Sequence, residues 1–217
     1  NNNNNNVHEI SAQILRRSLR RPESTTGLYY EAMLANIYKT IANLSNLVPN
    51  YTKDQRGYEL SGFVWHQGWN DGCNATMVAE YESNLANLIR DVRIDLDVPD
   101  LPVVIGVSGM NGWTPEETNN ARTKIIAAQF AVSDPRNYPE FKGTVSSVET
   151  RNYFRTSTQS PGTQIYHWNN NCESYWLIGE AMGKAMIELL SPNGDDNTEG
   201  EDTNDHIHHD DDHYKSQ

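Results

Sequence analysis

The chain has 217 residues, of which 36% are hydrophobic and 21% are charged, enough for one domain with a buried core. It contains no run of about 18 apolar residues, so the sequence predicts no membrane-spanning helix. The net charge of −12 argues against a protein that binds nucleic-acid backbones. Nine acidic residues and one lysine lie within residues 191–217, so the tail carries most of this charge.

The two ends differ in composition from the stretch between them. Residues 1–22 begin with six asparagines and continue with clustered arginines, so we expect a low-complexity, basic lead that is disordered or partly helical. Residues 191–217 are acidic and hold four of the seven histidines. This tail could bind a divalent metal weakly, but a solvated, disordered tail is the favoured interpretation. The sequence therefore predicts one folded domain over residues 23–190.

Helical and strand patterns alternate within this domain. Apolar residues recur at helical spacing in the segments 30–44, 81–92, 125–132 and 172–190. Apolar runs typical of buried strands occupy residues 62–65, 101–107 and 144–149. This alternation is typical of parallel βαβ units, so we predict a three-layer α/β/α fold around a parallel sheet. Ligands of such folds bind at the carboxyl ends of the strands.

Two local signals refine the helices. The run Thr114-Pro-Glu-Glu117 combines an N-cap threonine, a proline at the first helical position and a capping-box glutamate, so it predicts a helix start. In the last helix, Gly179 and Gly183 lie one turn apart, and we expect them to allow close packing on the sheet.

The loop after the first strand is rich in hydrogen-bond donors. Residues 65–73 read Trp-His-Gln-Gly-Trp-Asn-Asp-Gly-Cys, and the glycines would let the backbone approach a ligand. A side-chain amide of Gln67 or Asn70 could stabilise a developing oxyanion. A polar turn whose Asn and Asp cap the next helix explains the same residues equally well at this point.

His167 lies just before the last helix, between Tyr166 and Trp168, on the edge where a functional site is expected. An imidazole has the near-neutral pKa that a general base needs. The residue types alone do not identify the acceptor that would orient its ring, and a surface histidine is the ordinary alternative.

These two segments carry a resemblance to a known family. Gly62-Phe-Val-Trp-His-Gln-Gly-Trp-Asn-Asp71 and the stretch from Tyr166-His-Trp-Asn-Asn-Asn-Cys172 to Met186 resemble the sialate O-acetylesterase-like family. This family is the carbohydrate-esterase branch of the SGNH hydrolases, which have a flavodoxin-like fold. Residues 101–109 and 141–150 are also similar to it, so the resemblance covers roughly residues 26–190.

The resemblance implies a mechanism and site residues. Family members use a serine nucleophile, activated by a histidine, to remove O-acetyl groups from carbohydrates, and the chemistry asks for no metal or cofactor. Carried over by position, His167 would be the general base, and Gln67, Gly68 and Asn70 would supply the oxyanion contacts. The motif leaves open whether Gln67 or Asn70 provides the amide side chain.

The family's nucleophile is missing from this sequence. It lies near the N-terminus in a Gly-x-Ser-Asn turn, and no such turn precedes Gly62. Ser108 follows a strand, but Met110 stands where a nucleophile elbow needs glycine, so a turn residue near the site is the preferred interpretation. We therefore expect an esterase domain that is incomplete at its N-terminus. A signal peptide, if the protein is secreted, would likewise lie upstream of Asn1.

The histidine's partner also departs from the family. Many SGNH enzymes place Asp three residues before the histidine, and Gln164 occupies that position here. Glu149, at the end of the third strand, is the candidate replacement, and a backbone carbonyl could also orient the ring.

Several further residues fall near the expected site. Trp69, Trp113 and Trp168 could stack on a sugar ring, although packing is the default role for any one of them. Cys73 and Cys172 follow the two motifs, so they could form a disulfide across one cleft, with two buried free thiols as the alternative.

Two functions remain open at this stage. The first is an O-acetyl carbohydrate esterase seen without its nucleophile block. The second is a non-catalytic carbohydrate-binding relative or an inactive fragment. The expected partner is a carbohydrate, acetylated in the first case, and not a nucleic acid.

Overall fold

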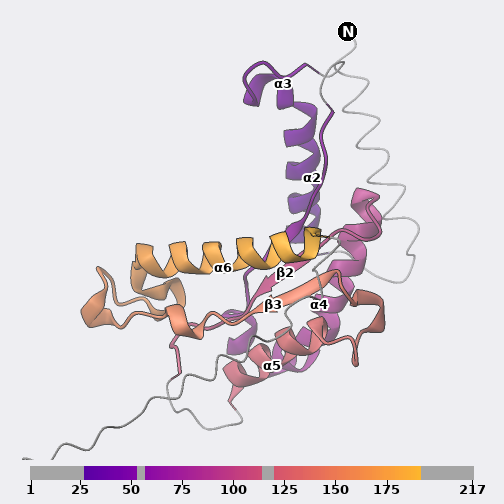
Figure 1. The fold of residues 1–217 in the computed structure, drawn as a ribbon. Coiled ribbons are helices and arrows are strands. Elements are labelled where there is room, and N and C mark those ends of the chain that lie inside the picture. Colours follow the sequence, from indigo (N-terminus) through magenta and orange to yellow (C-terminus); the bar gives the residue numbers. More distant parts are fainter. Residues whose placement is uncertain (1–26, 53–56, 114–119, 192–217) are drawn as a thin grey trace, which may run out of the picture.

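The computed structural model describes residues 27–52, 57–113 and 120–191 (Figure 1). The expected basic lead over 1–22 lies outside these residues. The expected acidic tail over 191–217 also lies outside them, apart from Ser191.

The described strands form one parallel sheet. They are β1 (Phe63–Trp65), β2 (Val103–Gly106) and β3 (Val145–Val148), hydrogen-bonded in the order β1-β2-β3. Helix α6 (Cys172–Leu190) crosses one face of the sheet, and α4 (Ala75–Leu96) and α5 (Ala121–Ser133) cover the other (Figure 1). The predicted three-layer α/β/α fold with a parallel sheet is confirmed.

The chain before the sheet forms α2 (Leu28–Ala42) and the short α3 (Leu44–Leu47). Helix α2 projects from the layered body (Figure 1) and meets the end of α4 through two tyrosines. Tyr30 Oη donates to the Asp95 carboxylate at 2.6 Å, and Tyr38 Oη donates to the Asp95 carbonyl. No helix in the described ranges combines the length and apolarity that a membrane span needs.

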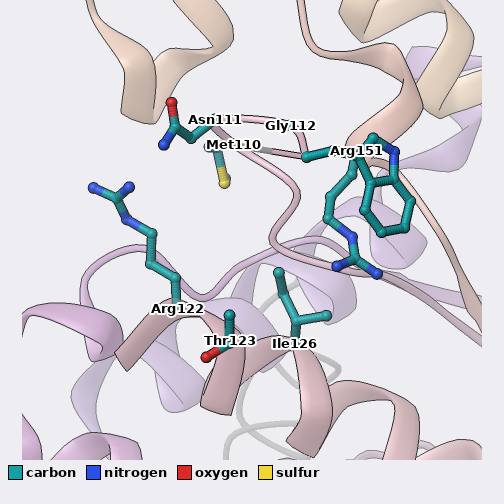
Figure 2. A pocket seen from close by; sticks show the side chains of 8 residues that line it. Met110, Asn111, Gly112, Arg122, Thr123, Ile126 and Arg151 are labelled. Atoms are coloured by element: carbon teal, nitrogen blue, oxygen red, sulfur yellow. The ribbon is translucent and has the colours of Figure 1, made fainter. Parts of the chain in front are cut away.

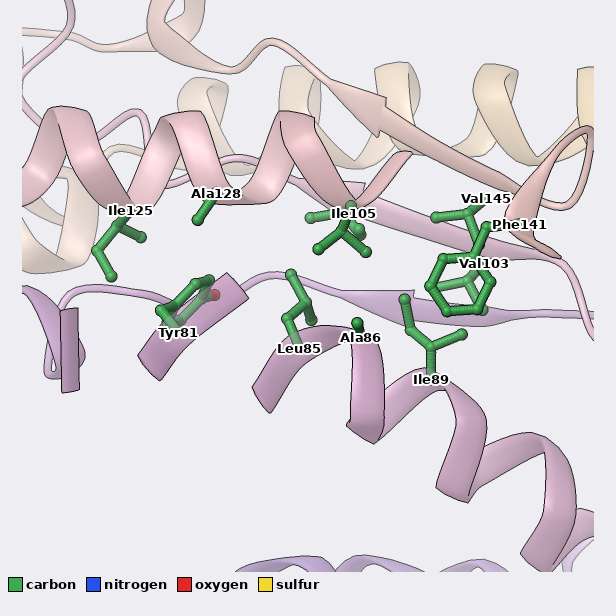
Figure 3. Close-up of a cluster of buried hydrophobic side chains, with 11 residues drawn as sticks. Tyr81, Leu85, Ala86, Ile89, Val103, Ile105, Ile125, Ala128, Phe141 and Val145 are labelled. Atoms are coloured by element: carbon green, nitrogen blue, oxygen red, sulfur yellow. The ribbon is translucent and has the colours of Figure 1, made fainter. Parts of the chain in front are cut away.

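The main core lies between the sheet and the helices α4 and α5 (Figure 3). Tyr81, Leu85, Ile89 and Val92 recur at helical spacing on α4 and are all buried. Every residue of β2 is buried, as expected for a central strand that helices cover on both faces. This core fixes the carboxyl ends of β1 and β2 relative to α5.

A second core lies under α6. Ile178, Met182 and Ala185 face β2 and are buried, so the predicted helix and most of its apolar face are confirmed. The expectation for Gly179 and Gly183 is wrong, because both are exposed and a Cβ at either would meet nothing within 4 Å. Each glycine directly follows a sheet-facing residue, and a helix turns about 100° per residue, so both point away from the sheet.

Strand β1 is less buried than the sequence pattern suggested. Phe63 and Trp65 pack against the α4–α5 core, but Val64 on the other face is 54% exposed. The described elements cover only one face of β1, so the expected strand buried on both faces is a half-covered edge strand. The sequence shows apolarity but not which face a neighbour covers.

Helix α5 begins later than expected. Its first residue is Ala121, and the Asn120 side chain caps it by accepting from the Thr123 N–H at 2.9 Å. The capping box expected over 114–117 lies outside the described residues.

The remaining turns are single 3₁₀ segments that shape the loops. They are η1 (Asp71–Cys73), η2 (Pro139–Phe141), η3 (Arg151–Tyr153), η4 (Ser157–Gln159) and η5 (Ile165–Asn170).

Candidate active site

The loop after β1 folds back on itself through its own polar side chains. Gln67 Nε2 donates to the Asp71 carboxylate at 2.5 Å, and Asn74 caps α4 by accepting from the N–H groups of Thr76 and Met77. Asp71 therefore closes the turn through Gln67, while the helix cap is Asn74, one residue beyond the quoted loop, and not Asn70 or Asp71. Asn70 stays exposed, and no described residue hydrogen-bonds its side chain.

Gly68 sits where only glycine fits. A Cβ atom at this position would lie 2.0 Å from Ser108 Oγ and 2.8 Å from a methyl group of Ile125, and the φ angle is +156°. Ser108 is 6% exposed, and its Oγ donates to the Gln67 carbonyl at 3.0 Å. No histidine among the described residues hydrogen-bonds this hydroxyl. Its hydrogen bond to Gln67 instead supports the loop after β1.

The loop that carries His167 has an unusual backbone. Trp168, Asn169 and Asn170 all have positive φ, between 52° and 57°, directly after His167. Consecutive left-handed residues other than glycine cost about 1–2 kcal/mol each, so surrounding contacts must hold them. His167 itself is exposed, and its carbonyl accepts from Tyr175 Oη at 3.0 Å.

Two buried asparagines hold this turn in place. Asn169 Nδ2 donates to the Arg155 carbonyl at 3.0 Å, and the Asn169 carbonyl accepts from the Gly162 N–H at 2.9 Å. Asn171 caps α6 by accepting from the Ser174 N–H at 3.0 Å. The His167 loop is therefore anchored on both sides, and its strained backbone is fixed by polar contacts.

A row of rings joins the two motif segments. The Trp69 and Tyr166 centroids lie 5.7 Å apart, and those of Tyr166 and His167 lie 4.6 Å apart. The guanidinium of Arg122, on α5, lies 4.4 Å from the ring centroid of Trp69. The structure therefore brings the loop after β1 and the loop before α6 together, as the βαβ topology predicts.

His66 is a second histidine at this edge. Its Nδ1 lies 2.9 Å from the Gly106 carbonyl, which can only accept, so Nδ1 carries the proton and Nε2 does not. Burial lowers the pKa of His66, against the opposing effect of that hydrogen bond. Its Nε2 and the nearby Trp168 Nε1 are both buried without a hydrogen-bond partner among the described residues.

Trp168 cannot present a face to a sugar, because it is 1% exposed and packs against His66 and Phe154. This finding corrects the expectation that it stacks on substrate. Its ring instead fills the core under the His167 loop.

The third strand contributes a separate cluster. Glu149 accepts two hydrogen bonds from the Arg151 side chain, and the Arg151 guanidinium lies 3.7 Å from the Trp113 ring centroid. Burial alone would raise the pKa of Glu149, but the bonds from Arg151 outweigh it and the pKa lies below its usual value. No hydrogen bond or ring contact joins Glu149 to His167 among the described residues.

A pocket opens between this cluster and α5 (Figure 2). Arg122 and Arg151 lie on opposite sides of it, and Met110 and Asn111 form its upper edge. Trp113 also lines it, next to Arg151. Trp113 is exposed, so its ring is accessible at the rim. The pocket offers cationic, amide and aromatic groups at the carboxyl ends of β2 and β3.

The two cysteines do not form a disulfide. Cys73 and Cys172 are free thiols and both are exposed, so the expected bridge and the alternative of buried thiols are both wrong. Cys73 ends η1 with its thiol on the Trp69 carbonyl at 3.4 Å, and Cys172 is the first residue of α6.

Sequence reasoning missed several residues of this region. His66 lay within the quoted motif, and Arg122, Gln129 and Arg151 lay on or beside predicted elements without a role. A polar residue on the apolar face of a helix was the available signal for Gln129, which lies one turn after Ile125.

A family model described as carbohydrate esterase, sialic acid-specific acetylesterase, matches residues 23–144, which is more than half of the chain. The matched range includes the loop after β1 and ends before His167. A probable carbohydrate esterase of Arabidopsis thaliana is 24% identical over 83 residues, covering 38% of this chain and 32% of that protein. The chain thus matches about a third of the length of this relative, and no solved structure matches.

The family match, the parallel sheet and the meeting of the two loops at its carboxyl edge agree with one another. The chain belongs to the sialic acid-specific acetylesterase family of carbohydrate esterases.

Proposed function

We propose that this chain supplies most of the active site of an esterase that removes O-acetyl groups from carbohydrates. The observation that carries the proposal is the ring row from Trp69 through Tyr166 to His167, which joins the amide-rich loop to a histidine. A deacetylase needs this combination, because a base must stand close to the donors that receive the oxyanion.

In the proposed mechanism His167 is the general base. It takes the proton of a serine hydroxyl as that oxygen attacks the acetyl carbonyl, and returns the proton to the departing sugar oxygen. Water then releases acetate from the acetylated serine by the same route. The serine is proposed to lie outside the present 217 residues, since the buried Ser108 hydroxyl is already bonded to the Gln67 carbonyl.

The oxyanion is proposed to bind at the Gln67–Gly68 loop. Gln67 Nε2 has a second hydrogen beyond the one given to Asp71, and the Gly68 N–H has no acceptor among the described residues. Asn70 is exposed and its amide has no hydrogen-bond partner in the described ranges, so it is the second candidate for the side-chain donor. Gln67→Ala and Asn70→Ala variants compared for kcat separate these two amides.

The carbohydrate is proposed to bind on aromatic rings of the site. Half-buried Trp69 beside Tyr166 and exposed Trp113 beside Arg151 offer two such rings. Arg122 and Arg151 would favour an acidic sugar, so O-acetylated sialic acid and an acetylated neutral sugar belong in one substrate panel.

Glu149 is proposed as the carboxylate that orients His167. In that role it would have to exchange Arg151, its present partner, for the imidazole. A Glu149→Gln variant that shifts the acidic limb of the kcat/KM profile to lower pH supports the role, because a carboxylate stabilises the protonated imidazole of the base. An unchanged profile would assign Glu149 to Arg151 alone.

The test compares two proteins on the same acetylated sugars, with acetate release as the measurement. The chain extended by the coding sequence upstream of Asn1 is expected to release acetate, and the 217-residue chain alone is expected to release none. Histidine-dependent release by the 217-residue chain would place the nucleophile inside it and overturn that part of the proposal. Saturable sugar binding by the extended protein without acetate release would favour the non-catalytic relative.

A further inference from the structure

A fully buried amide holds the loop after β1 from below. Gln129 on α5 is 0% exposed and lies among apolar residues of the main core. A buried amide is costly unless its donors and acceptor are all paired, so its partners show what the residue does.

Gln129 bridges the loops that follow β1 and β2. Its Oε1 accepts from the Ser108 N–H at 2.8 Å, and its Nε2 donates to the Gln67 carbonyl at 2.7 Å. A backbone N–H only donates and a carbonyl only accepts, so the amide has one workable orientation. Neither a carboxylate nor an apolar side chain can make both bonds.

The Gln67 carbonyl receives two further donors. Tyr81 Oη donates to it at 2.8 Å, and Ser108 Oγ donates at 3.0 Å. Burial raises the pKa of Tyr81 to about 12, so its hydroxyl keeps its proton at neutral pH. The Tyr81 side chain lies at the α5 end of the core cluster (Figure 3), where it also accepts from Gln129 Nε2 at 3.0 Å.

The Gln67 carbonyl thus accepts from Gln129, Tyr81 and Ser108. These three donors fix the direction of the peptide group that joins Gln67 to Gly68. The peptide joining Gln67 and Gly68 is trans, so its N–H points opposite to its carbonyl. The carbonyl points into the core below α4 and α5, and the Gly68 N–H therefore points out of it. Donors on a carbonyl also polarise the peptide, which makes the N–H on its other side a stronger donor.

We propose that Gln129 is a positioning residue that, with Tyr81 and Ser108, aims and polarises the Gly68 N–H for the oxyanion. The inference rests on the proposed function only for the identity of that acceptor. The fixed peptide orientation follows from the hydrogen bonds alone. Gln129 touches no reacting atom and acts through the Gln67–Gly68 peptide.

The first test needs no activity. In the 217-residue chain, Gln129→Met removes the bonds to the Ser108 N–H and the Gln67 carbonyl, together with those to the Tyr81 and Ser108 hydroxyls, at nearly constant volume. Val132→Ala, also fully buried on α5, serves as the control. The Gly68 amide signal in a ¹⁵N–¹H spectrum is expected to shift and broaden in Gln129→Met and to stay in place in Val132→Ala. A Gly68 signal that moves no more in Gln129→Met than in the control overturns the proposal.

The second test uses the extended protein and acetate release. Gln129→Met is expected to lower kcat about 10- to 100-fold with KM within about twofold of the parent, as for a misplaced oxyanion donor. Val132→Ala is expected to keep the parent kcat. A parent without activity refutes the proposed function, while the Gly68 signal still decides the positioning role.

Tyr81→Phe keeps the test decisive if Gln129→Met does not fold. It removes one of the three donors on the Gln67 carbonyl and leaves the ring in the core. A smaller shift of the Gly68 signal in the same direction supports the network. An unchanged Gly68 signal contradicts it.

Discussion

Replacing Asn169 by Ala tests how the His167 loop is held. The substitution removes the bond from Asn169 Nδ2 to the Arg155 carbonyl, worth about 1 kcal/mol, and places alanine at a φ of 52°. Asparagine tolerates this left-handed region better than alanine, which adds roughly 1 kcal/mol. The expected loss in the free energy of unfolding is therefore about 2 kcal/mol.

Asn169→Gly separates the two contributions. Glycine loses the same hydrogen bond but accepts the positive φ, so it should be about 1 kcal/mol more stable than the alanine variant. Urea denaturation of the 217-residue chain measures both, with the exposed Asn87→Ala on α4 as a control expected within about 0.5 kcal/mol of the parent. Equal stability of Asn169→Ala and the parent, or a glycine variant weaker than alanine, would refute this reasoning.

Three further changes test other contacts. Burial holds the pKa of His66 below 6.5, so the folded protein resists protonation of this ring and folding stability should fall as the pH drops below about 6.5. The His66→Asn variant keeps a donor for the Gly106 carbonyl, and its Tm should fall less than the parent's between pH 8 and 5. Arg93→Met removes a buried guanidinium that donates to the Leu101 carbonyl at 2.9 and 3.1 Å, so the free energy of unfolding measured in urea should fall by about 2–3 kcal/mol. A fall of less than about 0.5 kcal/mol would show that these bonds do not stabilise the fold. Gly68→Ala places a methyl group against Ser108 and Ile125, so the free energy of unfolding should fall by about 1–3 kcal/mol. A Tm equal to the parent's would show that the loop moves to accommodate the methyl group.

The sequence was a good guide to the order of elements and to the edge that carries the site. The last helix was predicted over 172–190 and is α6 with the same bounds, because its long apolar face is a strong local signal. Both motif loops were expected at the functional edge of the sheet, and the contact of Trp69 with Tyr166 shows that they lie together there. Parallel strands place such loops at one edge whatever their detailed conformation.

Features that depend on a partner's position could not be predicted. Ile125, Ala128 and Val132 predicted the apolar face of α5, and Gln129 lies on the same face. Its role depends on the Ser108 N–H and the Gln67 carbonyl beside it, which the sequence does not place there. For Trp168 the sequence left sugar stacking and packing both open, and the structure buries its ring in a segment of left-handed backbone. Side-chain direction in an irregular loop follows from backbone angles that residue types do not determine.

The central claim is that His167 is the base of an esterase site that the two loops share. The most direct measurement is kcat/KM for release of acetate by the extended protein and its His167→Ala variant, with His206→Ala in the tail as the control. The account predicts a loss of about 10²- to 10⁴-fold for His167→Ala and parent-like activity for His206→Ala. A His167→Ala variant as active as its parent would contradict the account.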